Sequence, residues 1–205
     1  MTNKLLFLVL LALCFSGCDM LETHPYDVHI TGERELNNKN IQLIENKMQG
    51  KKTIRFAMIS DTQRWYNSTE DVVKALNARG DIDFVIHGGD QSDFGVTKEF
   101  IWMRDIFNKF QMPYVCLLGN HDCLGTGEDA YRAIYGDPNF AFTAGNVRFI
   151  CLNTNAMEYD YSEPVPDFNF IENELNNLSP EIEKTVFAMH VKPVSYTHLR
   201  AHETP

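Results

Sequence analysis

The sequence feature that most constrains this chain is a repeated pairing, in which a short apolar segment runs directly into a polar cluster. The apolar segments are predicted strands over 53–60, 83–87, 113–118 and 185–189. The clusters that follow them are, in order, Asp61-Thr62-Gln63, Gly88-Gly89-Asp90-Gln91-Ser92-Asp93, Gly119-Asn120-His121-Asp122 and His190. A single Gly-Asp or Gly-Asn is more often a turn than a site. Four clusters in this arrangement predict a site, because ligands of open α/β sheets bind beyond the carboxyl ends of the strands.

Predicted helices alternate with the first three strands, which indicates a parallel α/β sheet. The strand over 53–60 is apolar on both faces, so we expect it to be buried between layers. A helix is expected from a cap at Ser68 through Ala78, with Gly80 beyond its end. The other predicted elements are a strand over 26–31, a helix over 36–48 that packs on the domain surface, helices over 97–110, 128–135 and 167–178, and a hairpin over 140–143 and 147–153.

The length and the net charge of the chain limit the class of protein to which it can belong. A chain of 205 residues is one domain with or without appendages, and we divide it into 1–18, an N-terminal extension 19–50, a main domain 51–193, and 194–205. The formal net charge of −10 argues against a nucleic-acid scaffold as partner, since phosphate backbones require clustered positive charge. The sequence contains no apolar run of the roughly eighteen residues that a membrane-spanning helix needs.

Residues 1–18 are predicted to be a lipoprotein signal peptide. Lys4 precedes an apolar stretch over 5–15 that has the length of a signal-peptide core. Ser16 and Gly17 then precede Cys18, and this pattern resembles the lipobox of bacterial lipoproteins, in which the cysteine is lipidated. An ordinary secretory signal is the alternative. The lipoprotein interpretation predicts a protein of the bacterial cell envelope, periplasmic or outer-membrane facing, that is bound to the membrane through its lipid anchor.

Three cysteines, Cys116, Cys123 and Cys151, follow the signal and the lipidation position. An odd number cannot form a complete disulfide framework, so the fold must depend on its core. A bridge between Cys116 and Cys123 is conceivable.

The segment 194–205 is predicted to be foreign to the protein. It has no strand or helix period that fits what precedes it, and it resembles the translation of a transposase-based sequencing adapter. We therefore expect a chain truncated near Pro193 with a non-native tail. His198 and His202, which share a helix face in principle, are excluded as metal ligands on this ground.

The polar clusters resemble the motifs of the calcineurin-like metallophosphoesterase superfamily, which includes the purple acid phosphatases. The motifs are D-x-H, G-D-x-x-D, G-N-H-[DE], a lone His and G-H-x-H, and the resemblance covers residues 54–190. It implies a layered α/β/β/α sandwich of the metallo-dependent phosphatase type, here with its last strands missing. It also implies a phosphate-ester substrate and two divalent metal ions, with Mn, Fe, Zn and Mg all open.

The resemblance implies roles for individual residues. Five of them match metal-ligand positions: Asp61, Gln63, Asp90, Asn120 and His190. Asp61 would ligate the first ion, Asp90 would bridge both, and Asn120 and His190 would hold the second. A bridging carboxylate suits this place, because it has two oxygens and a negative charge to share between two cations.

The resemblance also implies a catalytic group. His121 would sit beside the scissile phosphate, with Asp122 or Asp93 orienting its ring. An imidazole there can donate a proton to a leaving group, and a carboxylate neighbour favours its cationic form. The glycines before Asp90 and Asn120 are expected to let the backbone approach the metals closely.

Two departures from the motifs stand out. Gln63 replaces the histidine of D-x-H. An amide oxygen is a harder and weaker ligand than imidazole. We therefore expect either that the first ion is held less tightly or that another group or water completes the site. The G-H-x-H motif is absent, which we attribute to truncation.

Other polar and aromatic residues near the motifs are less specific. His87 ends a predicted buried strand and is expected to be structural. Arg64-Trp65-Tyr66 is either a surface loop or a place where a phosphate binds and a base or sugar stacks. Asn153-Thr154-Asn155 follows a strand and is a weaker candidate for the lining of the site.

The sequence therefore predicts a metal-dependent phosphoesterase that hydrolyses a phosphate mono- or diester. The alternative is a non-catalytic envelope lipoprotein that uses the same fold for binding, and Gln63 is the native feature that favours it. We expect the chain as given to be a poor enzyme, because the G-H-x-H ligands are absent from it.

Overall fold

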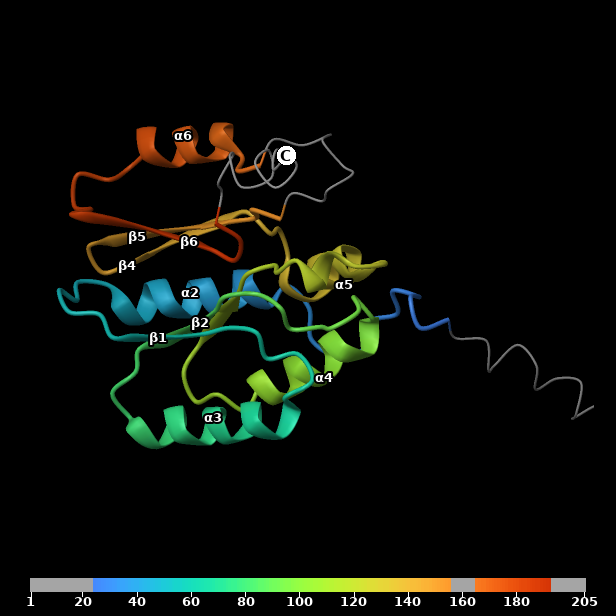
Figure 1. Ribbon diagram of the computed structural model, residues 1–205. Helices are drawn as coiled ribbons and strands as arrows, with labels where there is room; N and C mark the ends of the chain where they lie inside the picture. The colour runs from blue at the N-terminus through green and yellow to red at the C-terminus, as the bar shows by residue number, and fades with distance from the viewer. Residues whose placement is uncertain (1–23, 156–164, 193–205) are drawn as a thin grey trace, which may run out of the picture.

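The computed structural model describes residues 24–155 and 165–192 of the chain (Figure 1). Our predictions for Cys18 and for the segment 194–205 lie outside the described residues. None of the described helices is long and apolar enough to cross a membrane.

The first sheet consists of three parallel strands in the order β1-β2-β3, which are Phe56–Ile59, Phe84–His87 and Tyr114–Cys116. Helix α3 (Tyr66–Arg79) connects β1 to β2, and α4 (Thr97–Phe107) connects β2 to β3. Both helices cover the same face of this sheet (Figure 1), where Val73 and Phe100 are buried. The alternation of strands and helices in the sequence is thus confirmed as a parallel α/β unit.

The second sheet has the order β4-β5-β6, with strands Phe140–Ala144, Val147–Leu152 and Lys184–Met189. β4 and β5 form the predicted antiparallel hairpin, and β6 pairs with β5 in parallel. The hairpin turns at Gly145, whose φ of 57° suits glycine. Helix α6 (Phe168–Asn176) begins at Asp167, whose carboxylate accepts the N–H of Phe170, and it lies over the outer face of this sheet (Figure 1).

The two sheets pack face to face through aromatic side chains. Phe142 stacks on Phe149 with ring centroids 4.9 Å apart, and Phe84 of the first sheet meets the edge of Phe142 at 5.7 Å. Helices α3 and α4 on one side and α6 on the other complete an α/β/β/α arrangement (Figure 1).

Helix α2 (Leu36–Met48) packs on the domain with one face, as we expected, and this face reaches the core. Ile44 and Met48 are completely buried among the side chains between the two sheets. Asn37 is buried as well and holds the backbone of Cys116 in β3 through both its amide oxygen and its amide nitrogen. The loose spacing of apolar residues in the sequence did not predict that Ile44 and Met48 are completely buried.

Two predicted elements differ from the structure in their type or their start. The segment 26–31 is not a strand, because its carbonyls pair with side chains instead of a neighbouring strand: Thr97 Oγ1 donates to the carbonyl of Asp27 at 2.9 Å. Helix α3 begins at Tyr66, so Ser68 lies inside its first turn and does not cap it; Gly80 does end it, with φ of 68°.

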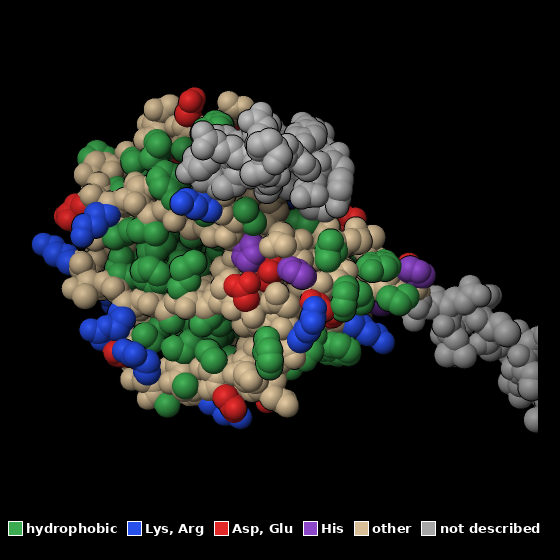
Figure 2. Space-filling model, viewed as in Figure 1, with side chains coloured by type: hydrophobic (Ala, Val, Ile, Leu, Met, Phe, Trp, Pro, Cys, Tyr) green, Lys and Arg blue, Asp and Glu red, His purple; other side chains and the backbone are tan. Residues whose placement is uncertain are grey.

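Strand β1 is an edge strand, not one buried between layers. Among the described strands it has a neighbour on one side only, and the exposed fractions of Phe56 and Met58 are 38% and 55%. In the second sheet, Phe187 of β6 is 42% exposed. Figure 2 shows the apolar area that results between the two sheets on the face viewed.

Candidate metal centre

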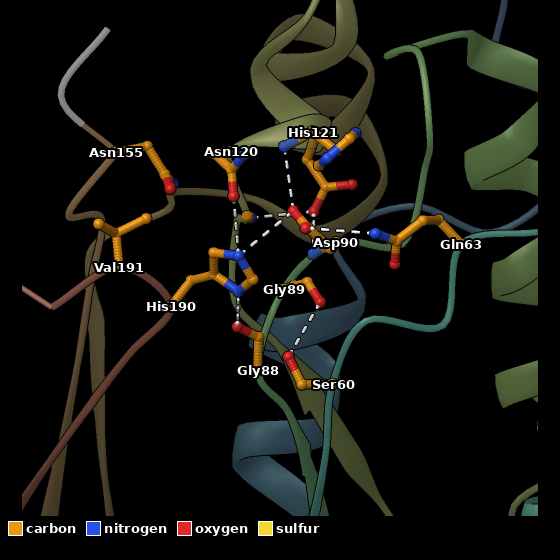
Figure 3. A network of polar contacts seen from close by, with 12 residues as sticks. Ser60, Gln63, Gly88, Gly89, Asp90, Asn120, His121, Asn155, His190 and Val191 are labelled. Carbon is orange, nitrogen blue, oxygen red and sulfur yellow. Dashed lines mark hydrogen bonds and ion pairs between the residues drawn. The ribbon is translucent and has the colours of Figure 1, made fainter.

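The predicted polar clusters come together at the carboxyl ends of the strands. The loops after β1 and β2 are joined by backbone hydrogen bonds, since the N–H of Asp61 donates to the carbonyl of Gly89 at 3.0 Å and that of Thr62 to Asp90 at 3.1 Å. The loop after β3 supplies Asn120, and His190 follows β6 in the second sheet (Figure 3). Four separate parts of the chain therefore meet at one place.

Three side chains at this place could hold one cation together. Asp61, Asp90 and His190 each offer a ligand atom, and these atoms all lie within 4.8 Å of one another. Asp90 is buried and Asp61 is exposed. Figure 2 shows carboxylates and histidines gathered on the same part of the surface.

Backbone strain is concentrated here. In the described chain, the non-glycine residues with positive φ are Asp61 (57°), Arg64 (66°), Asp90 (62°) and Glu35 (55°), and the first three lie in the loops of this centre. The left-handed region is uncommon for non-glycine residues and tends to be retained where a site requires it. Asp61 and Asp90 adopt this conformation in the loops that follow their strands, and their carboxylates lie close together there.

Two glycines allow the loops to approach each other. A Cβ atom on Gly119 would overlap the carboxylate and backbone nitrogen of Asp90, and a Cβ atom on Gly89 would lie 2.8 Å from Gly119 and from the His190 ring. The structure thus explains why a glycine precedes Asp90 and Asn120, as we expected from the sequence.

The donor set around His190 suits a cation. The Nδ1 atom of His190 lies 2.8 Å from the carbonyl of Gly88, which can only accept, so Nδ1 carries the proton. The other ring nitrogen, Nε2, lies 3.0 Å from Asn120 Oδ1 and 3.4 Å from Asp90 Oδ1 (Figure 3). In the neutral ring three acceptor atoms therefore face one another, and either protonation of the ring or a bound cation between them resolves the conflict.

Gln63 provides a further unused oxygen. Its Nε2 donates to Asp90 Oδ2 at 3.3 Å, and its Oε1 is buried without a hydrogen-bond partner. A buried unpartnered acceptor is costly unless something else satisfies it. The acceptors around His190, together with Asp61 and Asp90, show that the residues present fit a divalent metal ion.

Charges within the centre favour an ionised Asp90. Burial opposes its ionisation, but contacts with the His190 ring and the backbone N–H of His121 outweigh it, so the pKa of Asp90 lies below its ordinary value. The same contact with Asp90 raises the pKa of His190 against the effect of burial.

The His121 ring is held by the backbone of Asp93. Its Nδ1 lies 2.9 Å from the carbonyl oxygen of Asp93 and 3.6 Å from the Oδ1 atom of the same residue. Because the carbonyl can only accept, Nδ1 donates, and Nε2 is the ring nitrogen left for other partners. The Asp93 carboxylate itself pairs with Arg64, whose Nε and Nη2 each lie 2.6 Å from one of its oxygens.

Asp122 is directed away from the His121 ring. It is completely buried, and its two oxygens accept the backbone N–H groups of Asp90, Gln91, Ser92 and Gly119 at 2.8–2.9 Å. Burial raises the pKa of Asp122 to about 6, against the effect of these hydrogen bonds. Of the two carboxylates that we predicted as partners of His121, Asp93 is the one beside its ring, and Asp122 instead ties together the loops after β2 and β3.

Replacing Asp122 with alanine is expected to lower the free energy of unfolding by more than about 3 kcal/mol, because several buried N–H groups lose their acceptor and each costs about 1–3 kcal/mol. Denaturant unfolding measures the change. Asp71→Ala on the exposed surface of α3 is the matched control and should have little effect, since its partner Lys74 is exposed as well. Equal stability of the two variants would refute this structural role for Asp122.

His87 is a structural residue, as expected. It is buried, the N–H of Gly89 donates to its Nδ1 at 3.2 Å, and its Nε2 therefore donates to Thr62 Oγ1 at 2.9 Å. Burial lowers the pKa of His87 to about 3, so the ring is neutral.

Asn155 was only a weak candidate in the sequence, and its hydrogen bonds go to Leu118 and Asn153 and not to the proposed ligands. Its Nδ2 donates to the carbonyl of Leu118 at 2.9 Å, and its Oδ1 is buried without a partner. The described cysteines Cys116, Cys123 and Cys151 are all free, so the conceivable Cys116–Cys123 bridge is not formed.

Comparison with known proteins agrees with this geometry. The family model of the calcineurin-like phosphoesterases (Metallophos) matches residues 54–203 of this chain. The chain belongs to the calcineurin-like phosphoesterase family. The part of the match from residue 193 to residue 203 lies outside the described residues, and our domain boundary there stays a prediction.

Similar proteins support the family assignment. A 3',5'-cyclic-nucleotide phosphodiesterase of Nostoc sp. (strain PCC 7120) is 27% identical over 126 residues, which is 60% of this chain and 47% of the relative. The purple acid phosphatase PPD1 from yellow lupin (Lupinus luteus) seeds has a similar structure, with a TM-score of 0.52, 16% identity, and coverage of 68% of this chain and 30% of the other. This likeness confirms the predicted fold. The chain spans about half the length of the curated phosphodiesterase.

Proposed function

We propose that this calcineurin-like phosphoesterase hydrolyses phosphate mono- or diesters at a centre of two divalent metal ions. The observation that carries the proposal is the meeting of Asp61, Asp90 and His190 within 4.8 Å at the ends of strands from both sheets. Asp61 and Gln63 would hold one ion, Asn120 and His190 the other, and Asp90 both. Divalent ions in such a centre make water more acidic and neutralise charge on the phosphoryl group.

His121 would serve the reaction by moving a proton. Its Nδ1–H is fixed on the carbonyl of Asp93, so the ring can present only Nε2 to an ester. When the ring is charged, Nε2 can donate a proton to the departing oxygen; Asp93 orients the ring, and Arg64 holds the Asp93 carboxylate in place.

The position of Gln63 also bears on the alternative of a non-catalytic binding protein. Gln63 was the feature that favoured that alternative, yet its side chain lies beside Asp90, to which its Nε2 donates (Figure 3). A half-turn of the amide would present its oxygen instead, and an amide oxygen is a ligand that suits a hard cation. We therefore do not propose the non-catalytic role.

Metal analysis and turnover test the proposal together. Purified protein should bind two equivalents of Mn²⁺ in equilibrium dialysis, and it should hydrolyse p-nitrophenyl phosphate or bis(p-nitrophenyl) phosphate, with the preference separating monoesterase from diesterase activity. A version to which a G-H-x-H segment has been added is measured in parallel, because we expect the chain as given, which lacks this motif, to be a poor enzyme. If neither form binds two ions nor releases nitrophenol, the proposal fails.

We further propose that Cys18 carries a lipid that anchors the protein to the bacterial envelope. The supporting observation is the signal-like sequence over 1–18. Labelling with a fatty-acid probe in a bacterial host should be strong in the parent and absent in Cys18→Ser, and the variant should leave the membrane fraction because its lipid chains are lost. Labelling that persists in Cys18→Ser would contradict this assignment.

A further inference from the structure

The first part of the described chain, residues 24–33, is fastened along helix α4, and we call it the strap. The guanidinium of Arg104, which is buried in α4, donates to the carbonyl of Thr31 at 2.5 Å. Nearer the start of α4, Thr97 Oγ1 donates to the carbonyl of Asp27 at 2.9 Å. Because side chains of one helix hold it at both points, the course of the strap over the domain is fixed.

The strap begins beside the loop that carries His121. Thr126 Oγ1 donates to the carbonyl of Tyr26 at 2.5 Å. The Tyr26 ring also packs so closely on Gly125 that a Cβ atom on this glycine would overlap it. Both contacts lie a few residues after the short helix His121–Cys123. The described chain therefore begins on the side of the molecule where the proposed proton donor lies.

Exposed apolar side chains gather at this junction, and we call them the apolar rim. The rim consists of residues that are each 38–56% exposed: Tyr26, Val28, Phe94 and Leu124. They are joined by close packing, since Tyr26 lies on Gly125 and a Cβ atom on Gly95 would overlap the carbonyl of Leu124. Figure 2 shows apolar side chains between the acidic and histidine side chains of the centre and the start of the described chain. A contiguous apolar group of this kind on a surface indicates a partner.

We infer that the apolar rim rests on the lipid surface of the membrane to which Cys18 anchors the chain, so that the metal centre opens at the level of the lipid head groups. The inference rests on the lipid that we propose at Cys18. An extended chain spans at most about 3.5 Å per residue, so His24 lies within about 21 Å of Cys18. A tether this short keeps the domain at the membrane, and the fixed strap determines which side faces it.

The chemistry of the rim suits an uncharged lipid surface. Its side chains are aromatic and aliphatic, as in segments that lie in the membrane interface. The formal net charge of −10 opposes binding to anionic lipids. Stable attachment generally needs more than one contribution, and burial of the rim adds to that of the lipid anchor. We therefore expect docking on zwitterionic membranes.

Quenching of a fluorescent label by spin-labelled lipid tests this orientation. The full chain, produced with its signal peptide in a bacterial host, is labelled at Leu124→Cys and reconstituted into phosphatidylcholine vesicles that contain the quencher. Quenching should be several-fold stronger than for the same label at Lys184→Cys, an exposed position at the opposite end of β6 from His190. Val28→Cys is a second position on the rim and should behave like Leu124→Cys. The described native cysteines are buried, and the parent measures their background labelling.

A change in the rim itself provides a second measurement. Phe94→Ser removes apolar surface from the rim and should reduce the quenching of a label at Leu124→Cys. Phe168→Ser, which removes a similarly exposed ring from α6, is the matched control and should leave the quenching unchanged.

The outcomes separate this inference from the other proposals. If a fatty-acid probe does not label the parent, the lipid proposal fails and this inference fails with it. If the parent is labelled but quenching is equal at positions 124 and 184, or is unaffected by Phe94→Ser, only the docking of the rim is refuted. Neither result bears on the phosphoesterase proposal, which metal binding and turnover test separately.

Discussion

Asp90→Asn is expected to remove most bound metal and to lower turnover by about a thousandfold or more, which corresponds to about 4 kcal/mol of transition-state stabilisation. The change is nearly isosteric, and asparagine tolerates the left-handed conformation that Asp90 adopts at φ of 62°. What is lost is the negative charge that two cations would share. Asp90 is also the carboxylate that Gln63, His121 and His190 all contact, so no other described residue is placed to substitute for it.

The measurement combines metal content after dialysis against Mn²⁺ with steady-state turnover of the preferred nitrophenyl ester, in the most active form of the protein. Asp71→Asn, an exposed change on α3, is the control for loss of one carboxylate without loss of the centre. Two bound equivalents of metal together with normal turnover in Asp90→Asn would show that Asp90 does not bridge the ions.

His121→Ala is expected to reduce turnover by about a hundredfold to ten thousandfold while metal content stays near that of the parent. The ring makes its contact with the carbonyl of Asp93, and the metal-directed contact of this residue is its backbone N–H, which donates to Asp90 Oδ1 at 3.0 Å and survives the substitution. The loss should be smaller for p-nitrophenyl esters than for alkyl esters, because a good leaving group needs less help from a proton donor.

This dependence on the leaving group distinguishes proton transfer from a general structural effect. The control is His24→Ala, which removes an exposed histidine that is distant in sequence from His121. Loss of both metals in His121→Ala would make the ring a ligand, and an equal loss for alkyl and nitrophenyl esters would refute its role as a proton donor.

The site could be located from the sequence because its geometry follows from simple rules. Parallel strands end at one edge of their sheet, so the clusters at Asp61, Asp90 and Asn120 had to meet. The elements that hold them were predictable for a similar reason, since each strand is an apolar run with a polar boundary. His190 belongs to the second sheet, and its place beside Asp90 depended on the family resemblance.

The sequence could not show the hydrogen bonds that side chains form with backbone groups of distant loops. Asp122 is adjacent to His121 in sequence, which made it a natural partner for the ring, yet three of the four N–H groups that its oxygens accept lie 30 to 32 residues away. The contact between Arg64 and Asp93 depends on a left-handed residue that no local pattern predicts. The edge position of β1 could not be predicted from the sequence either, because an exposed strand and a covered strand can have the same apolar pattern.

The origin of the ligands in two different sheets has a consequence for the stability of the whole domain. Asp61 and Asp90 extend from the first sheet and His190 from the second, so an ion that contacts all three is a cross-link between the two halves of the sandwich. Such an ion binds the folded chain and has no equivalent site in the unfolded one, and its binding energy therefore adds to the cohesion of the sheets. If the proposed ions bind, the metal supply of the cell sets how long the folded chain persists, apart from any effect on turnover.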